Sequence, residues 1–293
     1  MALFRTFLFA PGNHARRVEK VFTIGADGVI LDLEDAVATA EKPATRPLIV
    51  AALQRPRNCL GYVRVNAMET PFCYADLVGV IGPGLDGIIL PKVETGAGLQ
   101  AIDWLVEQLE RERGLPRRSI DIIPIIETAR GIANLSEIMG AGTRVRRCSF
   151  GAGDFTFDAN VTWTRNEAEL AHARAQMVIH SRANGLEAPL DSVWVDIQDI
   201  EGLEASAQAV KRMGFQGKTC IHPGQIPVVN AVFSPTEAEL AFARRVVAAF
   251  EEAEAAGSAA FQIDGKFVDY PIVYRAQRVV KEHEAIVAAG RAG

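Results

Sequence analysis

The sequence has few residues of the kinds that build disulfide frameworks and zinc sites. Its 293 residues include four cysteines and five histidines, and no two cysteines form a Cys-x-x-Cys pair. The histidines show no metal-ligand spacing either, so a zinc site, a redox motif and a disulfide-rich secreted domain are disfavoured. We therefore expect reduced thiols and a cytoplasmic protein.

Long apolar runs and an excess of positive charge are also absent. No apolar run approaches the roughly 18 residues that a membrane span requires, and the run at residues 7–10 is too short for a secretory signal. Lysine and arginine number 31 against 36 aspartates and glutamates, a net charge of -5. This balance disfavours binding to polyanions, so neither nucleic acid nor a membrane is an expected partner.

Short apolar runs, rich in β-branched or aromatic residues, are what the sequence has instead. Eight of them alternate with segments of helical periodicity or turn signals. They lie at residues 5–9, 28–33, 61–65, 86–90, 121–126, 147–150, 192–195 and 218–221. Strand and helix alternating eight times predict an α/β fold, a (β/α)8 TIM barrel.

The C-terminal segment departs from this alternation. A long helical stretch at residues 235–256 precedes Gly257, a hairpin pattern surrounds Asp264 and Gly265, and Pro271 opens a last helix. We predict a catalytic barrel domain at residues 1–256 and a hairpin-plus-helix lid at residues 257–293. A lone hairpin is marginally stable in water, so the lid should pack on a neighbouring subunit of a homotrimer or homohexamer.

Charged residues follow the predicted strands at the end where a TIM barrel carries its catalytic groups. Two basic residues, Arg64 and Lys92, accompany five acids there. The acids are Glu34, Asp35, Glu127, Asp154 and Asp196. Each acid taken alone is equally consistent with a salt bridge or a helix cap.

Glu127 and Asp154 follow neighbouring strands and are the best candidates for a metal site. Clustered carboxylates repel one another unless a cation holds them, and oxygen ligands favour Mg²⁺ or Mn²⁺. The turn before Asp154, which ends at Gly153, lets the backbone approach a ligand closely. Lys92 could form a Schiff base, although an ion pair or a phosphate contact is the favoured interpretation.

Seven motifs at predicted strand ends resemble one known family. They are RTFLFAPG at 5–12, LDLEDAV at 31–37, VRVN at 63–66, LPK at 90–92, IETARG at 126–131, GAGD at 151–154 and IHP at 221–223. In this order, over nearly the whole chain, they are similar to the citrate lyase β-subunit (CitE-like) family of the HpcH/HpaI aldolase superfamily. The resemblance implies a TIM barrel, Mg²⁺ bound by Glu127 and Asp154, and substrate contacts from Arg64 and Gly153.

The resemblance also implies a CoA thioester as the substrate. The thioester would pass Phe9 and Lys20, beside the turn at Ile221 and His222. Malyl-CoA lyases tend to carry an arginine where this sequence has His14, so that CoA-phosphate contact lacks its usual residue.

A Mg²⁺-dependent carbon–carbon lyase is the activity that the resemblance implies. The substrate would be a 3-hydroxyacyl-CoA such as (S)-citramalyl-CoA or malyl-CoA, and the products acetyl-CoA and a 2-oxo acid. Arg64 would stabilise the oxyanion, Glu34 and Asp35 would orient Arg64 or hold metal-bound water, and Asp269 from a neighbouring lid would protonate the enolate.

Three alternatives to this activity remain open at the level of the sequence. They are a citrate lyase β-type enzyme acting on a citryl thioester, a metal-dependent 2-keto acid aldolase that needs no CoA, and a non-catalytic CoA-binding subunit.

Overall fold

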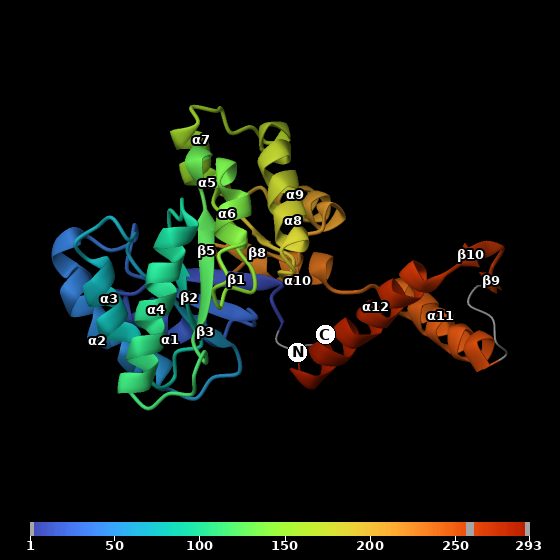
Figure 1. The fold of residues 1–293 in the computed structure, drawn as a ribbon, viewed down its shortest axis with the longest axis horizontal. Helices are drawn as coiled ribbons and strands as arrows, with labels where there is room; N and C mark the ends of the chain where they lie inside the picture. The colour runs from blue at the N-terminus through green and yellow to red at the C-terminus, as the bar shows by residue number, and fades with distance from the viewer. Residues whose placement is uncertain (1–2, 256–260, 291–293) are drawn as a thin grey trace. The chain divides into compact units, whose positions relative to one another are not determined.

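The computed structural model describes residues 3–255 and 261–290 (Figure 1). The chain forms two compact units, one of Phe4–Asn230 and the other of Ala231–Gly293 together with the first three residues. The first unit contains the barrel, and the second contains the hairpin and the last two helices.

In the described part of the first unit, eight parallel strands close into a barrel in sequence order, which confirms the predicted (β/α)8 fold. The strands are β1 (Thr6–Pro11), β2 (Gly28–Asp32), β3 (Leu60–Arg64), β4 (Gly87–Leu90), β5 (Asp121–Ile126), β6 (Ser149–Phe150), β7 (Leu190–Asp191) and β8 (Gly217–Cys220). Their apolar side chains form a core inside the barrel, including Phe7, Ile30, Tyr62, Ile89 and Ile123. Strands buried on both faces explain why the sequence shows continuous apolar runs here rather than alternation.

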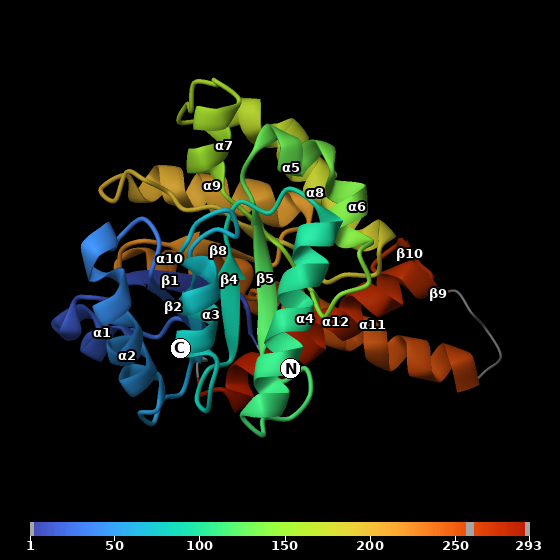
Figure 2. The ribbon, with the colours of Figure 1, turned by 60° about the vertical axis from the view of Figure 1, so that its left-hand side comes forward.

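Helices follow the strands and surround them on the outside (Figure 2). They are α1 (Ala15–Val21), α2 (Lys42–Leu53), α3 (Cys73–Val80), α4 (Gly96–Glu112), α5 (Ala129–Ala133), α6 (Leu135–Met139), α7 (Ala152–Asp158), α8 (Ala171–Ala183), α9 (Ile200–Met213) and α10 (Gln225–Phe233). Short 3-10 helices occupy Thr39–Glu41 and Ala168–Leu170. Thr95 caps α4 by accepting a hydrogen bond from the backbone N–H of Gly98.

The seventh strand is a correction to the sequence analysis. It comprises Leu190–Asp191, whereas the apolar pattern predicted residues 192–195. Leu190 pairs with Ser149 on one side and with Gly217 on the other, and the strand pairing ends at Asp191. The β-branched residues beyond it lie in a loop, where Val195 is exposed. Pairing with the neighbouring strands therefore sets the bounds of β7, although local propensity favours a strand at residues 192–195.

The second unit has its own hydrophobic core. Helix α11 (Glu237–Ala255) packs against α12 (Tyr270–Ala288), and both contribute to a cluster with the hairpin strands β9 (Phe261–Ile263) and β10 (Lys266–Val268). Asp264 and Gly265 have φ values of 53° and 72°, as a type I′ hairpin turn requires. The predicted hairpin and helix thus form. The predicted domain boundary after residue 256 lies outside the described residues, and packing on a neighbouring subunit stays a prediction.

Among the described residues, none of the helices combines the length and the apolar character that crossing a lipid bilayer would require.

Candidate active site

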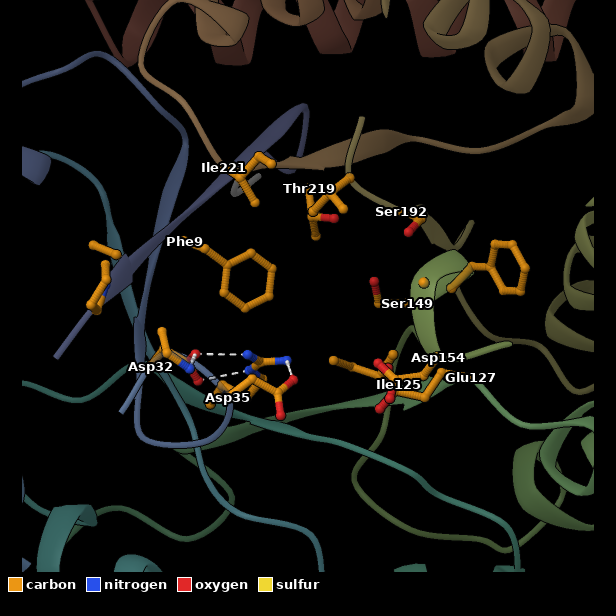
Figure 3. A pocket seen from close by; sticks show the side chains of 18 of the residues that line it. Phe9, Asp32, Asp35, Ile125, Glu127, Ser149, Asp154, Ser192, Thr219 and Ile221 are labelled. Carbon is orange, nitrogen blue, oxygen red and sulfur yellow. Dashed lines mark hydrogen bonds and ion pairs between the residues drawn. The ribbon is translucent and has the colours of Figure 1, made fainter. Parts of the chain in front are cut away.

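A cavity of about 460 Å³ opens at the C-terminal ends of the barrel strands (Figure 3). Its volume is in the range of small-molecule sites. Most of the charged residues that the sequence placed at this rim line it or contact residues that line it. The lining includes Phe9, Asp32, Asp35, Arg64, Glu127, Gly153, Asp154 and Ile221.

Arg64 is held on one side of the cavity by Asp32, which the sequence analysis did not single out. The two residues are register neighbours at the ends of β3 and β2. The guanidinium donates from Nε and Nη2 to the two carboxylate oxygens of Asp32, each at 2.7 Å. Burial by itself would raise the pKa of Asp32, yet the hydrogen bonds and the charge of Arg64 outweigh it and lower that pKa. A bidentate pair of this kind fixes the plane and the position of the guanidinium.

The third guanidinium nitrogen of Arg64 faces the loop after β2. Its Nη1 lies 2.9 Å from Glu34 Oε2 and 3.3 Å from Asp35 Oδ2. Glu34 is buried, whereas the side chain of Asp35 is 60% exposed. The guanidinium also lies over the Phe9 ring, with its carbon 5.0 Å from the ring centroid. The predicted role of Glu34 and Asp35 in orienting Arg64 fits these contacts.

Lys92 lies between Glu34, which contacts Arg64, and Asp154. Its ammonium lies 2.7 Å from Glu34 Oε1 and 3.6 Å from Asp154 Oδ1. Its backbone is left-handed, with φ at 53°, a conformation that non-glycine residues seldom adopt. In this conformation its backbone N–H donates to Glu127 Oε1 at 2.8 Å. The strained residue therefore positions Glu127 and balances charge between Glu34 and Asp154.

Glu127 and Asp154 lie together on the side of the cavity opposite Asp32 and Asp35 (Figure 3). Burial, together with the negative charges of Asp154 and Glu34, raises the pKa of Glu127 to about 8. Burial likewise raises the pKa of Glu34. Glu127 and Glu34 are therefore disfavoured as anions in the absence of a further cation.

The local backbone is shaped around Glu127. A methyl group on Gly151 would collide with the Glu127 carboxylate and with Ile125. Only glycine lets the chain pass this close to the carboxylate before it enters α7. Asp154 lies in the first turn of that helix.

The charges at the cavity fit a divalent cation. Five carboxylates, of Asp32, Glu34, Asp35, Glu127 and Asp154, line or adjoin it, with three basic side chains, of Arg17, Arg64 and Lys92. Five negative charges less three positive charges leave a net charge of -2 when all are ionised. In the described part of the chain, no cluster of three or more His, Cys, Asp or Glu side chains has the geometry of a metal site. Because a hard divalent cation takes six or more oxygen ligands, one held by Glu127 and Asp154 alone would have positions for substrate or water.

Other predicted site residues lie away from the cavity or in the second unit. Asp196 lies in the loop after β7, where its Oδ1 accepts a hydrogen bond from the backbone N–H of Gln198. It does not line the cavity. Its displacement follows from the corrected seventh strand.

Three candidates for the CoA path are not among the residues that line the cavity. Lys20 is exposed on α1, His14 precedes that helix, and exposed His222 follows Ile221. Asp269 is the N-cap residue directly before α12 in the second unit, and its side chain makes no capping hydrogen bond.

The sequence analysis missed several lining residues besides Asp32. Arg17 comes from α1, and Ser149, Ser192 and Thr219 come from the last three strands or their ends. Ser192 was predicted to begin the seventh strand, whereas in the structure it follows that strand, so its place at the rim was hidden. Asp32 could have been found, because it is the last residue of β2 within the LDLEDAV motif.

Comparisons with known proteins agree with this architecture. Residues 5–223 match the family described as HpcH/HpaI aldolase/citrate lyase. The citrate lyase subunit beta of Leuconostoc mesenteroides subsp. cremoris is 39% identical over 279 residues, 94% of this chain and 92% of that protein. The L-malyl-CoA/beta-methylmalyl-CoA lyase of Rhodobacter capsulatus is 35% identical over 302 residues, 96% of this chain and 94% of that protein.

A solved structure shares the fold over the same extent. The CitE protein of Mycobacterium tuberculosis, crystallised with magnesium, acetoacetate and coenzyme A, superposes with a TM-score of 0.76. The two chains are 32% identical, and the match covers 97% of this chain and 99% of that one. The strand-end motifs, the barrel and these alignments together show that the chain is an enzyme of the HpcH/HpaI aldolase/citrate lyase family.

Proposed function

We propose that this enzyme is a Mg²⁺-dependent lyase that cleaves the carbon–carbon bond of a 3-hydroxyacyl-CoA, such as (S)-citramalyl-CoA or malyl-CoA. The products would be acetyl-CoA and a 2-oxo acid. The observation that carries the proposal is the pair of Glu127 and Asp154, which lines the same cavity as the fixed guanidinium of Arg64.

Glu127 and Asp154 are the residues that would hold Mg²⁺, or Mn²⁺ in its place. When bound, the ion supplies Lewis acidity to the oxygens of the 2-hydroxy acid half of the substrate and balances the surrounding carboxylates. The raised pKa of Glu127 supports this assignment, because a buried carboxylate next to two others is stabilised as an anion by a cation.

Arg64 would stabilise the oxygen on which negative charge develops. Its charge is permanent, and Asp32 prevents it from rotating, so its donors need no reorganisation during the reaction. Its contact with exposed Asp35 is longer than those with Asp32 and Glu34, and a substrate oxygen could replace it.

The reaction requires two proton movements. The substrate hydroxyl releases its proton to solvent as the carbonyl of the 2-oxo acid forms, and the electrons of the broken bond move into the thioester enolate. The enolate carbon then takes a proton, which we assign to Asp269 of a neighbouring subunit.

That assignment requires a lid at residues 257–293 that closes on the barrel of another chain in a homotrimer or homohexamer. We also propose that the CoA chain passes Phe9 and Ile221, with Lys20 and His222 at its edge, and that the enzyme acts in the cytoplasm.

The decisive experiment is a product analysis of the purified enzyme with Mg²⁺ and four substrates: malyl-, methylmalyl-, citramalyl- and citryl-CoA. The proposal expects equal amounts of an acyl-CoA and a 2-oxo acid. Release of free CoA with an intact hydroxy acid would indicate hydrolysis instead. Glu127→Gln protein is the control for contaminating activity.

The same assay separates the remaining alternatives. Preference for citryl-CoA would favour the citrate lyase β-type reaction, in line with the Leuconostoc relative. Cleavage of free citramalate at the rate of its thioester would favour a CoA-independent aldolase. Correctly folded protein that binds CoA and cleaves none of these compounds would indicate a non-catalytic subunit.

A further inference from the structure

Three hydroxyl side chains line one side of the cavity and have no role in the reaction proposed above. Ser149 belongs to β6, Ser192 follows β7 directly, and Thr219 belongs to β8. Asp191 pairs with Lys218, so Ser192 and Thr219 follow at the same level of the barrel. Figure 3 shows the three on the same side, across from Asp32 and Asp35. We call Ser149, Ser192 and Thr219 the hydroxyl wall.

The wall retains unused hydrogen-bonding capacity. Ser192 Oγ accepts from the backbone N–H of Ala152 at 2.8 Å, which leaves its own hydrogen to donate. Thr219 Oγ1 donates to the carbonyl of Asp191 at 3.2 Å, which leaves its lone pairs to accept. Within the described residues, no protein group pairs with the hydroxyl of Ser149, although this residue is 3% exposed. The wall can therefore both donate to and accept from a ligand.

The wall carries no charge. The basic residues that line the cavity, Arg17 and Arg64, come from α1 and β3. Lys218 is fully buried and paired with Asp191. A carboxylate placed against the wall would lie in the cavity that holds Glu127 and Asp154, and none of the three wall side chains would supply a positive charge to it. A neutral hydroxyl is the polar group that matches these three side chains.

The wall faces the half of the substrate that becomes the 2-oxo acid. Strand β6, which carries Ser149, continues through Gly151 into α7 and Asp154. Asp154 and Glu127 would hold that half through the metal, so its substituent is directed to this side. This step rests on the proposed function.

We propose that the hydroxyl wall is a specificity determinant, and that it selects a 2-oxo acid with a hydroxyl group on the carbon next to the carbonyl. The same preference applies to the parent 3-hydroxyacyl-CoA. A methyl group in that place leaves the Ser149 hydroxyl unpaired, and one lost hydrogen bond in a closed site corresponds to about a tenfold loss of affinity.

Hydroxypyruvate and 2-oxobutyrate test the proposal, because they differ by one hydroxyl in place of one methyl. Their dissociation constants are measured by calorimetry on the full-length enzyme with Mg²⁺. Wild type should bind hydroxypyruvate about tenfold more tightly, and Ser149→Ala and the isosteric Thr219→Val should each reduce this ratio. Ser181→Ala, which removes a buried hydroxyl of α8 that does not line the cavity, should leave the ratio unchanged.

Three results overturn the proposal. The first is wild type that binds hydroxypyruvate no more tightly than 2-oxobutyrate, including the case of no binding up to about 10 mM. The second is a ratio of the two dissociation constants that is the same as in wild type in both Ser149→Ala and Thr219→Val. The third is tighter binding of oxaloacetate than of hydroxypyruvate, which would assign the wall to a carboxylate.

A separate assay keeps this test distinct from that of the proposed reaction. Condensation of acetyl-CoA with each 2-oxo acid reports on lyase chemistry, whereas the binding ratio reports on the wall. A binding preference that depends on Ser149, in an enzyme that makes no carbon–carbon bond, would refute the reaction and support the wall.

Discussion

Replacing Asp32 by asparagine should destabilise the protein although the shape of the side chain is retained. Asp32 Oδ1 accepts from Arg64 Nε and from the backbone N–H of Glu34, and Oδ2 accepts from Arg64 Nη2 and from the backbone N–H of Ala36. Asparagine has one oxygen. Its amide nitrogen would face two donors in either orientation, and Arg64 would lose its main buried counter-charge.

The cost follows from these contacts. One charge-assisted hydrogen bond and one backbone hydrogen bond are lost, and their donors stay buried. Breaking a buried ion pair by removing one charge costs about 3–5 kcal/mol, and we expect Asp32→Asn to lower the free energy of unfolding by this amount. Asp35→Asn is the matched control, because its contact with Arg64 is longer and its side chain is exposed. It should cost less than about 1 kcal/mol.

Urea unfolding of the metal-free proteins, followed by circular dichroism at one protein concentration, measures both values. The folded protein holds the pKa of Asp32 below its ordinary value, so its contribution is present above about pH 4 and is lost as the pH falls through the lowered pKa. The difference between wild type and Asp32→Asn should therefore shrink in acid. Equal stabilities of Asp32→Asn and Asp35→Asn at pH 7 would refute the reasoning.

Three further predictions concern the metal, Lys92 and the lid. Glu127→Gln should abolish Mg²⁺ binding in calorimetry. The metal-free variant should unfold at a temperature no lower than that of wild type, because the raised pKa of Glu127 means that the folded state disfavours its negative charge. A lower unfolding temperature would contradict this reason. EDTA should remove activity, and full turnover in EDTA would exclude the metal. Asp154→Asn should behave as Glu127→Gln does. Borohydride added during turnover with a 2-oxo acid should leave the mass of the protein unchanged, and an adduct on Lys92 would establish a Schiff base. Asp269→Asn and Glu127→Gln enzymes should each be nearly inactive but regain activity when refolded together, whereas inactive mixed oligomers would count against an aspartate supplied by the neighbour.

Most of the candidate site could be predicted from the strand-end motifs, because a barrel brings the ends of successive strands together in space. Once eight strands were recognised, the residues after them had to meet at one rim, so Arg64, Lys92, Glu127 and Asp154 could be brought together without coordinates. The hairpin was equally local, since Asp264 and Gly265 specify their turn by backbone preference alone.

Other features depended on register and on contacts across the barrel. Residues 192–195 have the composition of a strand, yet pairing with β6 and β8 ends the seventh strand at Asp191 and leaves Ser192 at the cavity. A linear pattern does not show that the two carboxylate oxygens of Asp32 accept hydrogen bonds from Nε and Nη2 of Arg64, on the next strand. Nor does a linear pattern show that Lys92 has a left-handed backbone, with its N–H on Glu127 and its ammonium on Glu34.

The sequence by itself thus determined the barrel, its order of strands and the chemical types at its rim. These depend on local propensity, apolar periodicity and a topology with few alternatives. The tertiary structure decided which carboxylate holds Arg64, which carboxyl groups have a raised pKa, and which hydroxyl in the cavity remains unpaired. Burial, charge and hydrogen bonding between residues distant in the sequence set these properties, so they exist only once the strands have closed.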